Sequence, residues 1–141
     1  MSVSHIPTTV RRQVETPARH CCEYCLLPDG VSFFPHEIDH IIAEKHGGET
    51  TLENLALACW RYNRYKGTDL GSFDPQTGDF VFLFNPRAQQ WTAHFRWQET
   101  LLDPLTPEGR TSVFLLRFNL PDRQDERKRL IERSHYPPFE L

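Results

Sequence analysis

An acidic residue and a histidine stand side by side at Asp39-His40, and two asparagines, Asn54 and Asn63, follow at short intervals. A histidine side chain is ordinarily a neutral base near physiological pH and can activate water. Carboxylate and carboxamide oxygens are the hard ligands that Mg²⁺ or Mn²⁺ prefers. These positions meet if the chain folds as a strand, a loop, a second strand and a helix. The four residues therefore predict a small α+β unit with one site.

The segments around these residues carry matching local signals. Residues 33–39 are rich in β-forming side chains and predict a strand, with His40 as the first residue of the loop that follows. Residues 31–34 share this composition, although Pro35 limits how regular a strand can be there. The apolar run 54–58 is followed by a segment that is predicted to be helical up to Lys66 and to stop at Gly67.

Outside this unit, residues 8–20 predict a short helix that Pro17 ends or kinks. Beyond Gly67, a turn at residues 74–79 leads into a predicted strand over 80–84. The alternation of Trp91, Ala93, Phe95 and Trp97 with polar residues predicts a second, half-buried strand.

Two helices are predicted near the C-terminus. The first has Thr106 as its N-cap and Pro107 as its first residue, and runs to about Asn119. Pro121 breaks it, and a second, highly charged helix is predicted from Asp122 to about Arg133.

Composition excludes several classes of protein. The 141 residues suffice for one domain with a real core, and no run of 18 apolar residues predicts a membrane span. The first ten residues lack an apolar signal region, and the four cysteines are too few and too bunched for a disulfide scaffold. Their spacing indicates metal ligation or reduced thiols. A cytoplasmic protein without a membrane partner is expected, and no obligate protein partner is evident.

The formal net charge of −3 argues against a protein that binds nucleic acid through bulk charge alone. A local basic face remains compatible with it. Such a face is predicted from Arg61, Arg64 and Lys66, with Lys45 nearby. The simpler alternative is a solvated helix surface.

The residues from His36 to His40 also match HExxH, the zinc-binding pattern of metalloproteases. That pattern requires a helix, so that both histidines share one face. Aromatic residues, β-branched residues and a proline crowd the approach to His36, and no third zinc ligand follows at a familiar spacing. The protease interpretation is therefore the weaker one.

Taken in order, the motifs Asp39-His40-Ile41-Ile42, Gly47-Gly48, Asn54-Leu55 and Cys59-x3-Asn63-x2-Lys66-Gly67 resemble the HNH endonuclease family, with its ββα-metal fold. The resemblance is close over about residues 18–67. Residues 68–97 resemble, more loosely, an extension in a bacterial subgroup of small HNH proteins.

The resemblance implies a role for each matching residue. His40 is implied as the general base, and Asp39 and Asn63 as ligands of a catalytic Mg²⁺ or Mn²⁺ ion. Asn54 is implied as the residue that fixes the loop aiming His40. Arg61, Arg64, Lys66 and Lys45 would contact DNA phosphates, which positions the protein without reading sequence.

The chain departs from the family at the zinc knuckle. Zinc-bearing members use two CxxC pairs, whereas here Cys22 and Cys25 form the first pair and Cys59 is followed by Tyr62 in place of the fourth cysteine. A phenol is a poor zinc ligand beside a thiolate. Three alternatives stay open: three thiolates completed by water or a histidine, a site completed by Cys21, or a knuckle held by packing without Zn²⁺.

The sequence thus predicts an α+β protein with a ββα-metal core, a C-terminal β-hairpin and two helices. Residues 1–70 form the nuclease core and residues 71–141 an extension packed on it as one domain. The expected function is metal-dependent hydrolysis of DNA phosphodiesters by a one-metal, histidine-base mechanism. The alternative is a non-catalytic nucleic-acid-binding module of the same fold.

Overall fold

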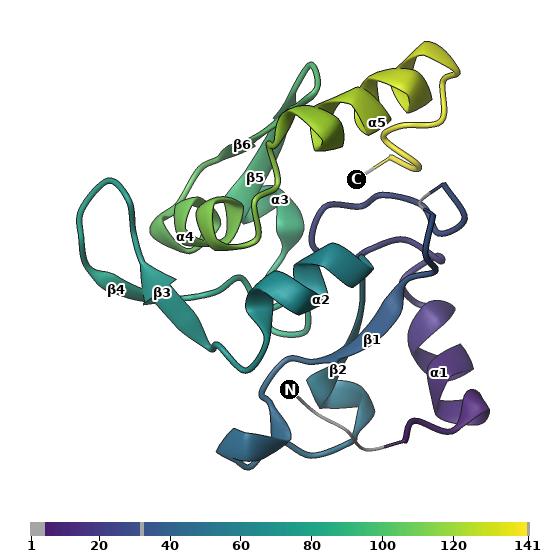
Figure 1. Ribbon diagram of the computed structural model, residues 1–141, viewed down its shortest axis with the longest axis vertical. Helices are drawn as coiled ribbons and strands as arrows, with labels where there is room; N and C mark the ends of the chain where they lie inside the picture. Colours follow the sequence, from purple (N-terminus) through teal and green to yellow (C-terminus); the bar gives the residue numbers. More distant parts are fainter. Residues whose placement is uncertain (1–4, 32, 141) are drawn as a thin grey trace.

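Three separate two-stranded antiparallel sheets and five α-helices make up the computed structural model, which describes residues 5–31 and 33–140 (Figure 1). The central unit pairs β1 (Glu37–His40) with β2 (Leu55–Ala58), and α2 (Trp60–Lys66) lies against this pair. This is the expected ββα arrangement in an α+β fold.

All four residues of strand β2 are buried, because other parts of the chain pack against both of its faces. Successive side chains of a strand point to opposite faces. Leu55 and Leu57 accordingly pack with Val14 on α1 (Thr8–Glu15), whereas Ala56 and Ala58 join the main hydrophobic core on the other face. Helix α1 ends at Glu15, so it is shorter than the helix expected over residues 8–20 and stops before Pro17.

The connection from β1 to β2 contains two short 3₁₀ turns, η1 (Glu44–His46) and η2 (Leu52–Asn54). Gly47 follows η1 with φ of 87°, a left-handed conformation that glycine adopts without strain. Helix α2 then ends at Gly67, whose φ is 52°, as the sequence predicts. Gly47 thus marks a turn within the connection between β1 and β2, and Gly67 marks the end of the ββα unit.

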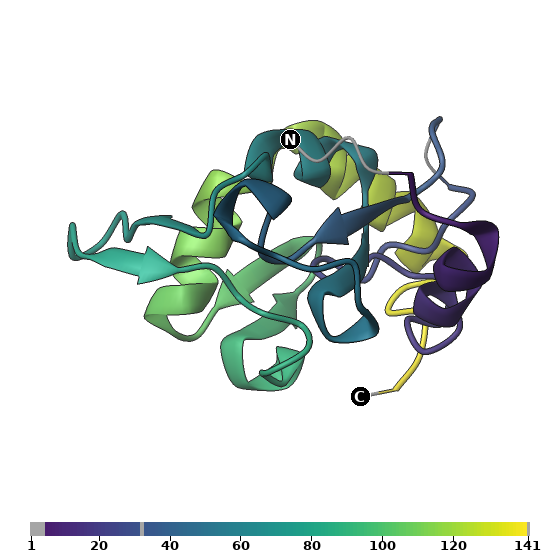
Figure 2. The same cartoon turned by 90° about the horizontal axis from the view of Figure 1, so that it is seen from below.

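The second half of the chain begins with a hairpin of β3 (Gly71–Phe73) and β4 (Phe80–Phe82), which projects from the body of the molecule (Figure 2). The chain continues through α3 (Trp91–His94) and a hairpin of β5 (Phe95–Gln98) and β6 (Leu101–Pro104). Helices α4 (Pro107–Leu115) and α5 (Pro121–Glu132) follow.

The prediction of one strand from Trp91 to Trp97 is wrong in its first half, where α3 forms a single helical turn. The Trp91 indole donates to the Tyr24 carbonyl at 2.8 Å, which holds it against the knuckle. One helical turn also brings Trp91 and Phe95 to ring contact at 5.2 Å. The tertiary contact therefore overrides the alternating pattern, and the strand begins only at Phe95.

The prediction of a strand over residues 31–34 is also wrong, and β1 begins only at Glu37. Phe33 is 93% exposed, and the Phe34 ring meets the Trp60 ring at 4.8 Å. No neighbouring strand lies beside the described residues of this segment, so its β-forming side chains have no sheet to join. His40 is the last residue of β1 rather than the first of the loop.

The C-terminal helices largely agree with the sequence. The Thr106 hydroxyl accepts from the Gly109 amide at 3.1 Å and caps α4, which ends at Leu115 instead of near Asn119. Asn119 leaves the helix because its side chain pairs with both backbone groups of Leu102, at 3.0 and 2.9 Å. Pro121 opens α5 rather than only ending the previous helix.

No helix in the described part of the chain is long and apolar enough to cross a bilayer.

Contacts from the second half of the chain converge on the Cys22–Cys25 segment. Arg87 binds the Glu23 carboxylate through two hydrogen bonds of 2.7 Å. The Tyr136 hydroxyl donates to the Cys25 carbonyl at 2.7 Å and accepts from the Trp97 indole at 2.8 Å. These polar links tie residues 87–136 directly to the ββα unit.

A buried ion pair holds the projecting hairpin to α4. Arg110 binds both oxygens of Asp74 at 2.7 to 3.2 Å, and these hydrogen bonds lower the pKa of that carboxyl from 3.8 to about 2. A group with a depressed folded pKa stabilises above its unfolded pKa, and loses this effect as pH falls through its folded pKa.

We therefore expect Asp74→Asn to lower the thermal midpoint by a few degrees at about pH 6, because the charged pair is lost. The difference between variant and wild type should shrink below about pH 4 and vanish near pH 2. Thermal unfolding of both proteins across this range measures it. Asp79→Asn is the control from the same turn, and equal effects of the two variants would contradict the assignment.

Candidate functional site

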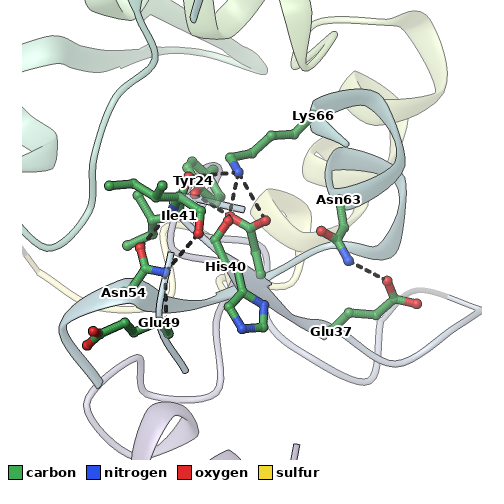
Figure 3. A network of polar contacts seen from close by, with 10 residues as sticks. Tyr24, Glu37, His40, Ile41, Glu49, Asn54, Asn63 and Lys66 are labelled. Carbon is green, nitrogen blue, oxygen red and sulfur yellow. Dashed lines mark hydrogen bonds and ion pairs between the residues drawn. The ribbon is translucent and has the colours of Figure 1, made fainter. Parts of the chain in front are cut away.

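The expected site residues lie on two faces of β1. Glu37 and Asp39 face α2, where they contact Asn63 and Lys66 respectively. Those two helix residues are three positions apart and so share one side of α2. The ring of His40 extends away from α2, toward the loop that joins β1 to β2 (Figure 3).

Asp39 is buried, with 2% of its surface exposed, and both of its carboxylate oxygens are bound. The Tyr24 hydroxyl donates to one oxygen at 2.8 Å, and the Lys66 ammonium lies 3.2 Å from the other. Burial raises the pKa of the Asp39 carboxyl, and the charge of Lys66 opposes that rise. This carboxylate therefore lies in a pocket that accommodates a positive charge.

Lys66 also donates to the carbonyls of His40 and Ile41 at 3.0 and 3.1 Å (Figure 3). Its ammonium is 3% exposed. The prediction that Lys66 contacts DNA phosphates from the helix surface is therefore wrong for this structure. The side chain fastens α2 to the end of β1, because a buried ammonium needs acceptors on all sides.

The imidazole of His40 is anchored at one nitrogen. Nε2 lies 2.9 Å from the Thr50 hydroxyl and 3.4 Å from a carboxylate oxygen of Glu44. Among the described residues, none is in hydrogen-bond contact with the other nitrogen, Nδ1. A carboxylate beside one ring nitrogen orients the ring and favours a proton there, which leaves the second nitrogen as the basic one.

Asn54 closes the loop that follows His40. Its carboxamide accepts from the Ile42 amide and donates to the Ile42 and Glu49 carbonyls, each at 2.8 Å. Gly48 permits this closure, because a Cβ added there would stand 1.7 Å from the Ile42 carbonyl oxygen and 2.8 Å from the Asn54 amide nitrogen. The side chain of Asn54 thus replaces backbone pairing across the loop.

Asn63 donates to Glu37 at 2.8 Å, and Arg64 binds the same carboxylate at 2.8 and 3.2 Å. No hydrogen bond joins Asn63 to Asp39. Sequence reasoning missed Glu37, although its place two residues before Asp39 puts it on the same strand face. It also missed Glu44, Thr50 and Tyr24, which no local pattern links to the site.

The HExxH interpretation fails because His36 and His40 do not lie on a helix. His36 precedes β1, and its Nε2 bonds the Leu27 carbonyl at 2.8 Å deep in the structure. His40 is engaged by a different loop on the far end of the strand. The two imidazoles cannot share a zinc ion in this arrangement.

The remaining basic residues differ in availability. Arg61 forms an ion pair with Asp122, and Arg64 pairs with Glu37 but keeps half of its side chain exposed. Lys45 is exposed on η1, in the loop that also carries Glu44. A basic face in this structure therefore consists of Arg64 and Lys45 more than of Arg61.

Three thiols form a second candidate centre at the N-terminal end of α2, where Cys59 is the N-cap. The sulfur atoms of Cys22, Cys25 and Cys59 lie within 4.8 Å of one another, and all three are buried. Burial raises the pKa of Cys22 and Cys59. At Cys25 the same burial is outweighed by the neighbouring Cys22 and Cys59 side chains, and its pKa falls well below the usual range. The cluster is compatible with structural Zn²⁺.

Cys21 does not belong to this cluster. Its thiol donates to the Arg19 carbonyl at 3.4 Å, and its sulfur lies outside the group of three. Four free cysteines are present in the described chain, so no disulfide competes for these sulfurs. The alternative in which Cys21 completes the site is not supported by this geometry.

The closure around Gly48 gives a direct test of the loop. Gly48→Ala should lower the free energy of unfolding by about 1–3 kcal/mol, because the loop must move to relieve the overlap. It should also speed hydrogen exchange of the Ile42 amide. Gly47→Ala is the matched control, since its φ costs strain but its Cβ would meet open space. Unchanged exchange at Ile42 in Gly48→Ala would contradict this account of the loop.

Comparisons with known proteins agree with this geometry. Residues 22–69 match the family model described as HNH endonuclease, and this span covers the cysteine cluster, both strands of the site and α2. No curated protein and no solved structure matches the chain. The matched span contains Asp39-His40, Asn54 and Asn63, so residues 22–69 of this chain are similar to the HNH endonuclease family.

Proposed function

We propose that this chain is a metal-dependent endonuclease that hydrolyses DNA phosphodiester bonds, with His40 as the general base. The observation that carries the proposal is that the His40 ring is held in a fixed orientation through one of its two nitrogens. One nitrogen is anchored by Thr50 and Glu44, and hydrogen bonds through Asn54 fix the loop beside it. A base that must deprotonate water needs this fixed orientation, because misplacement by about 1 Å costs much of the rate.

The basic atom in this proposal is Nδ1. A proton on Nε2 is favoured by the neighbouring Glu44 carboxylate, so Nδ1 carries the free electron pair. It takes a proton from the attacking water and becomes part of an imidazolium, which Glu44 stabilises. The ring then returns that proton to solvent or to the leaving group.

Asp39 and Asn63 offer the donor types that a hard divalent cation prefers. Asp39 offers carboxylate oxygen and Asn63 carboxamide oxygen, the ligand types that Mg²⁺ or Mn²⁺ selects. The Asp39 pocket already holds a cationic group, Lys66, so the local field favours positive charge. A bound cation would neutralise the phosphate and support the leaving oxygen. Asp39 and Asn63 are the residues that would hold it.

A second candidate function is a nucleic-acid-binding module without catalysis. The observation in its favour is that Asp39 is satisfied by Tyr24 and Lys66 in the described structure, without any ion. A chain with this internal pairing would keep its fold and still present Arg64 and Lys45 to a phosphate backbone. Cleavage of plasmid DNA with and without Mg²⁺ separates the two functions.

His40→Ala should reduce the rate of DNA cleavage by about 10²–10⁴-fold, the usual contribution of a general base. Binding of DNA should change little, since the ring lies against its own loop. The matched control is His46→Ala, which removes an exposed histidine from the same loop and should leave the rate unchanged. Equal rates for His40→Ala and wild type would refute the assignment of the base.

Asn63→Ala should raise the Mg²⁺ concentration needed for half-maximal cleavage, because it removes a ligand oxygen. Arg64→Ala is the matched control, since Arg64 touches the same Glu37 carboxylate without being a ligand. Metal titrations of both variants at constant ionic strength measure the shift. If both variants shift the titration equally, Asn63 acts through Glu37 and is not a ligand.

A further inference from the structure

The hydroxyl of Tyr62 is a buried polar atom without a hydrogen-bond partner. The residue is 1% exposed, and its oxygen is among the few buried side-chain atoms of the described chain that remain unsatisfied. Native structures pair nearly all such atoms, so an unpaired hydroxyl is a candidate to bind a ligand such as a metal ion. Its surroundings indicate which partner that is.

Tyr62 belongs to the same buried cluster of the main hydrophobic core as Cys22, Cys25 and Cys59. It follows Cys59 by three residues, the same spacing that separates Cys22 from Cys25. Residues three apart on a helix share one side, so Tyr62 lies on the side of α2 that begins at Cys59, where a second CxxC pair would have its last cysteine.

Packing fixes the ring in this direction. The Tyr62 ring meets the Phe118 ring at 4.9 Å within the main hydrophobic core. A rigid ring holds its hydroxyl at one place, which reduces the entropy that a ligand loses on binding. The thiol of Cys21, the other donor expected from the sequence, bonds the Arg19 carbonyl instead.

A second buried group with unsatisfied polar atoms is Arg123. Arg123 is 5% exposed, and two of its three guanidinium nitrogens, Nε and Nη1, have no hydrogen-bond partner. It pairs with Glu126 and interacts electrostatically with Tyr62, Cys59 and Cys25. A buried cation with spare donors complements groups that become anionic, as thiolates and a phenolate do when they bind a metal ion.

We propose that Tyr62 is the fourth ligand of a structural zinc site, in which Cys22, Cys25 and Cys59 supply sulfur and Tyr62 supplies oxygen. Zn²⁺ binds thiolate sulfur and anionic carboxylate oxygen in tetrahedral sites, and a tyrosine offers a comparable anionic oxygen only once its phenol has lost its proton. Four metal–ligand bonds form, the remaining thiol and phenol protons leave to solvent, and nothing is oxidised or reduced. The substitution of tyrosine for cysteine then changes the ligand set instead of abolishing the site.

A zinc ion bound by Tyr62 would also affect the position of Asn63 in the neighbouring site. Tyr62 directly precedes Asn63 on α2, and Cys59 directly precedes the helix. An ion bound between these residues and the 22–25 knuckle would fix the rotation of α2. The proposal stands independently of DNA cleavage, since it concerns the loading of the knuckle and is measured by metal binding.

The test uses the reduced full-length chain and four proteins: wild type, Tyr62→Phe, Tyr62→Cys and Tyr65→Phe. Zinc content is measured by elemental analysis, and affinity by competition with a chromogenic chelator. We expect one Zn²⁺ per wild-type chain and at least about 10-fold weaker binding in Tyr62→Phe, which removes only the hydroxyl. Tyr62→Cys should bind at least as tightly as wild type. Tyr65→Phe, on the same helix, should be unchanged.

Co²⁺ provides a second reading. Wild type should give the visible bands of a tetrahedral site, and these bands should shift in Tyr62→Phe and not in Tyr65→Phe. Wild-type affinity and spectra in Tyr62→Phe would overturn the assignment, as would a reduced wild-type chain that binds no zinc. Should Tyr62→Phe fail to fold, the ultraviolet difference spectrum of wild type on zinc addition decides: ionisation of a tyrosine supports the proposal, and its absence overturns it.

Discussion

The buried contact between Lys66 and the end of β1 is the interaction on which the site depends most. One ammonium bonds the Asp39 carboxylate and the carbonyls of His40 and Ile41, so a single side chain joins α2 to the residues that carry the chemistry. Removal of one partner from such a buried pair is strongly destabilising, because the other charge is left uncompensated. The same contact places Asn63, one turn earlier on α2, beside Glu37. Strand, helix and the start of the loop therefore move as one unit.

A different set of contacts positions the ring of His40. The ring lies on the other side of β1 and is held by Thr50 and Glu44 from the loop. Asn54 fixes the conformation of that loop, because its carboxamide binds the backbone of Ile42 and Glu49. A base on one face of a strand and an oxygen-rich pocket on the other are thus fixed independently.

Local sequence patterns predicted most of the elements and failed where tertiary contacts compete with them. The helix over 60–66, the cap at Thr106 and the two C-terminal helices follow from capping residues and stops that act within a few positions. The β-forming residues at 31–34 form no strand because no partner strand lies beside them. The alternation from Trp91 to Trp97 is interrupted because the Trp91 indole bonds Tyr24, which is distant in sequence. Neither outcome is encoded in the segment itself.

For the site, the sequence by itself determined the identity and order of the chemical groups: Asp39-His40, the two asparagines and the three cysteines at their spacings. It also determined the ββα order of elements, since glycines at 47, 48 and 67 mark where the chain can turn. Only the tertiary structure decided which groups face one another. Burial turned Lys66 from an expected surface cation into the partner of Asp39, and placed Tyr62 in one buried cluster with the three cysteines. The physical reason is that a buried polar group must find a partner across the fold, and such partners lie far away in the sequence.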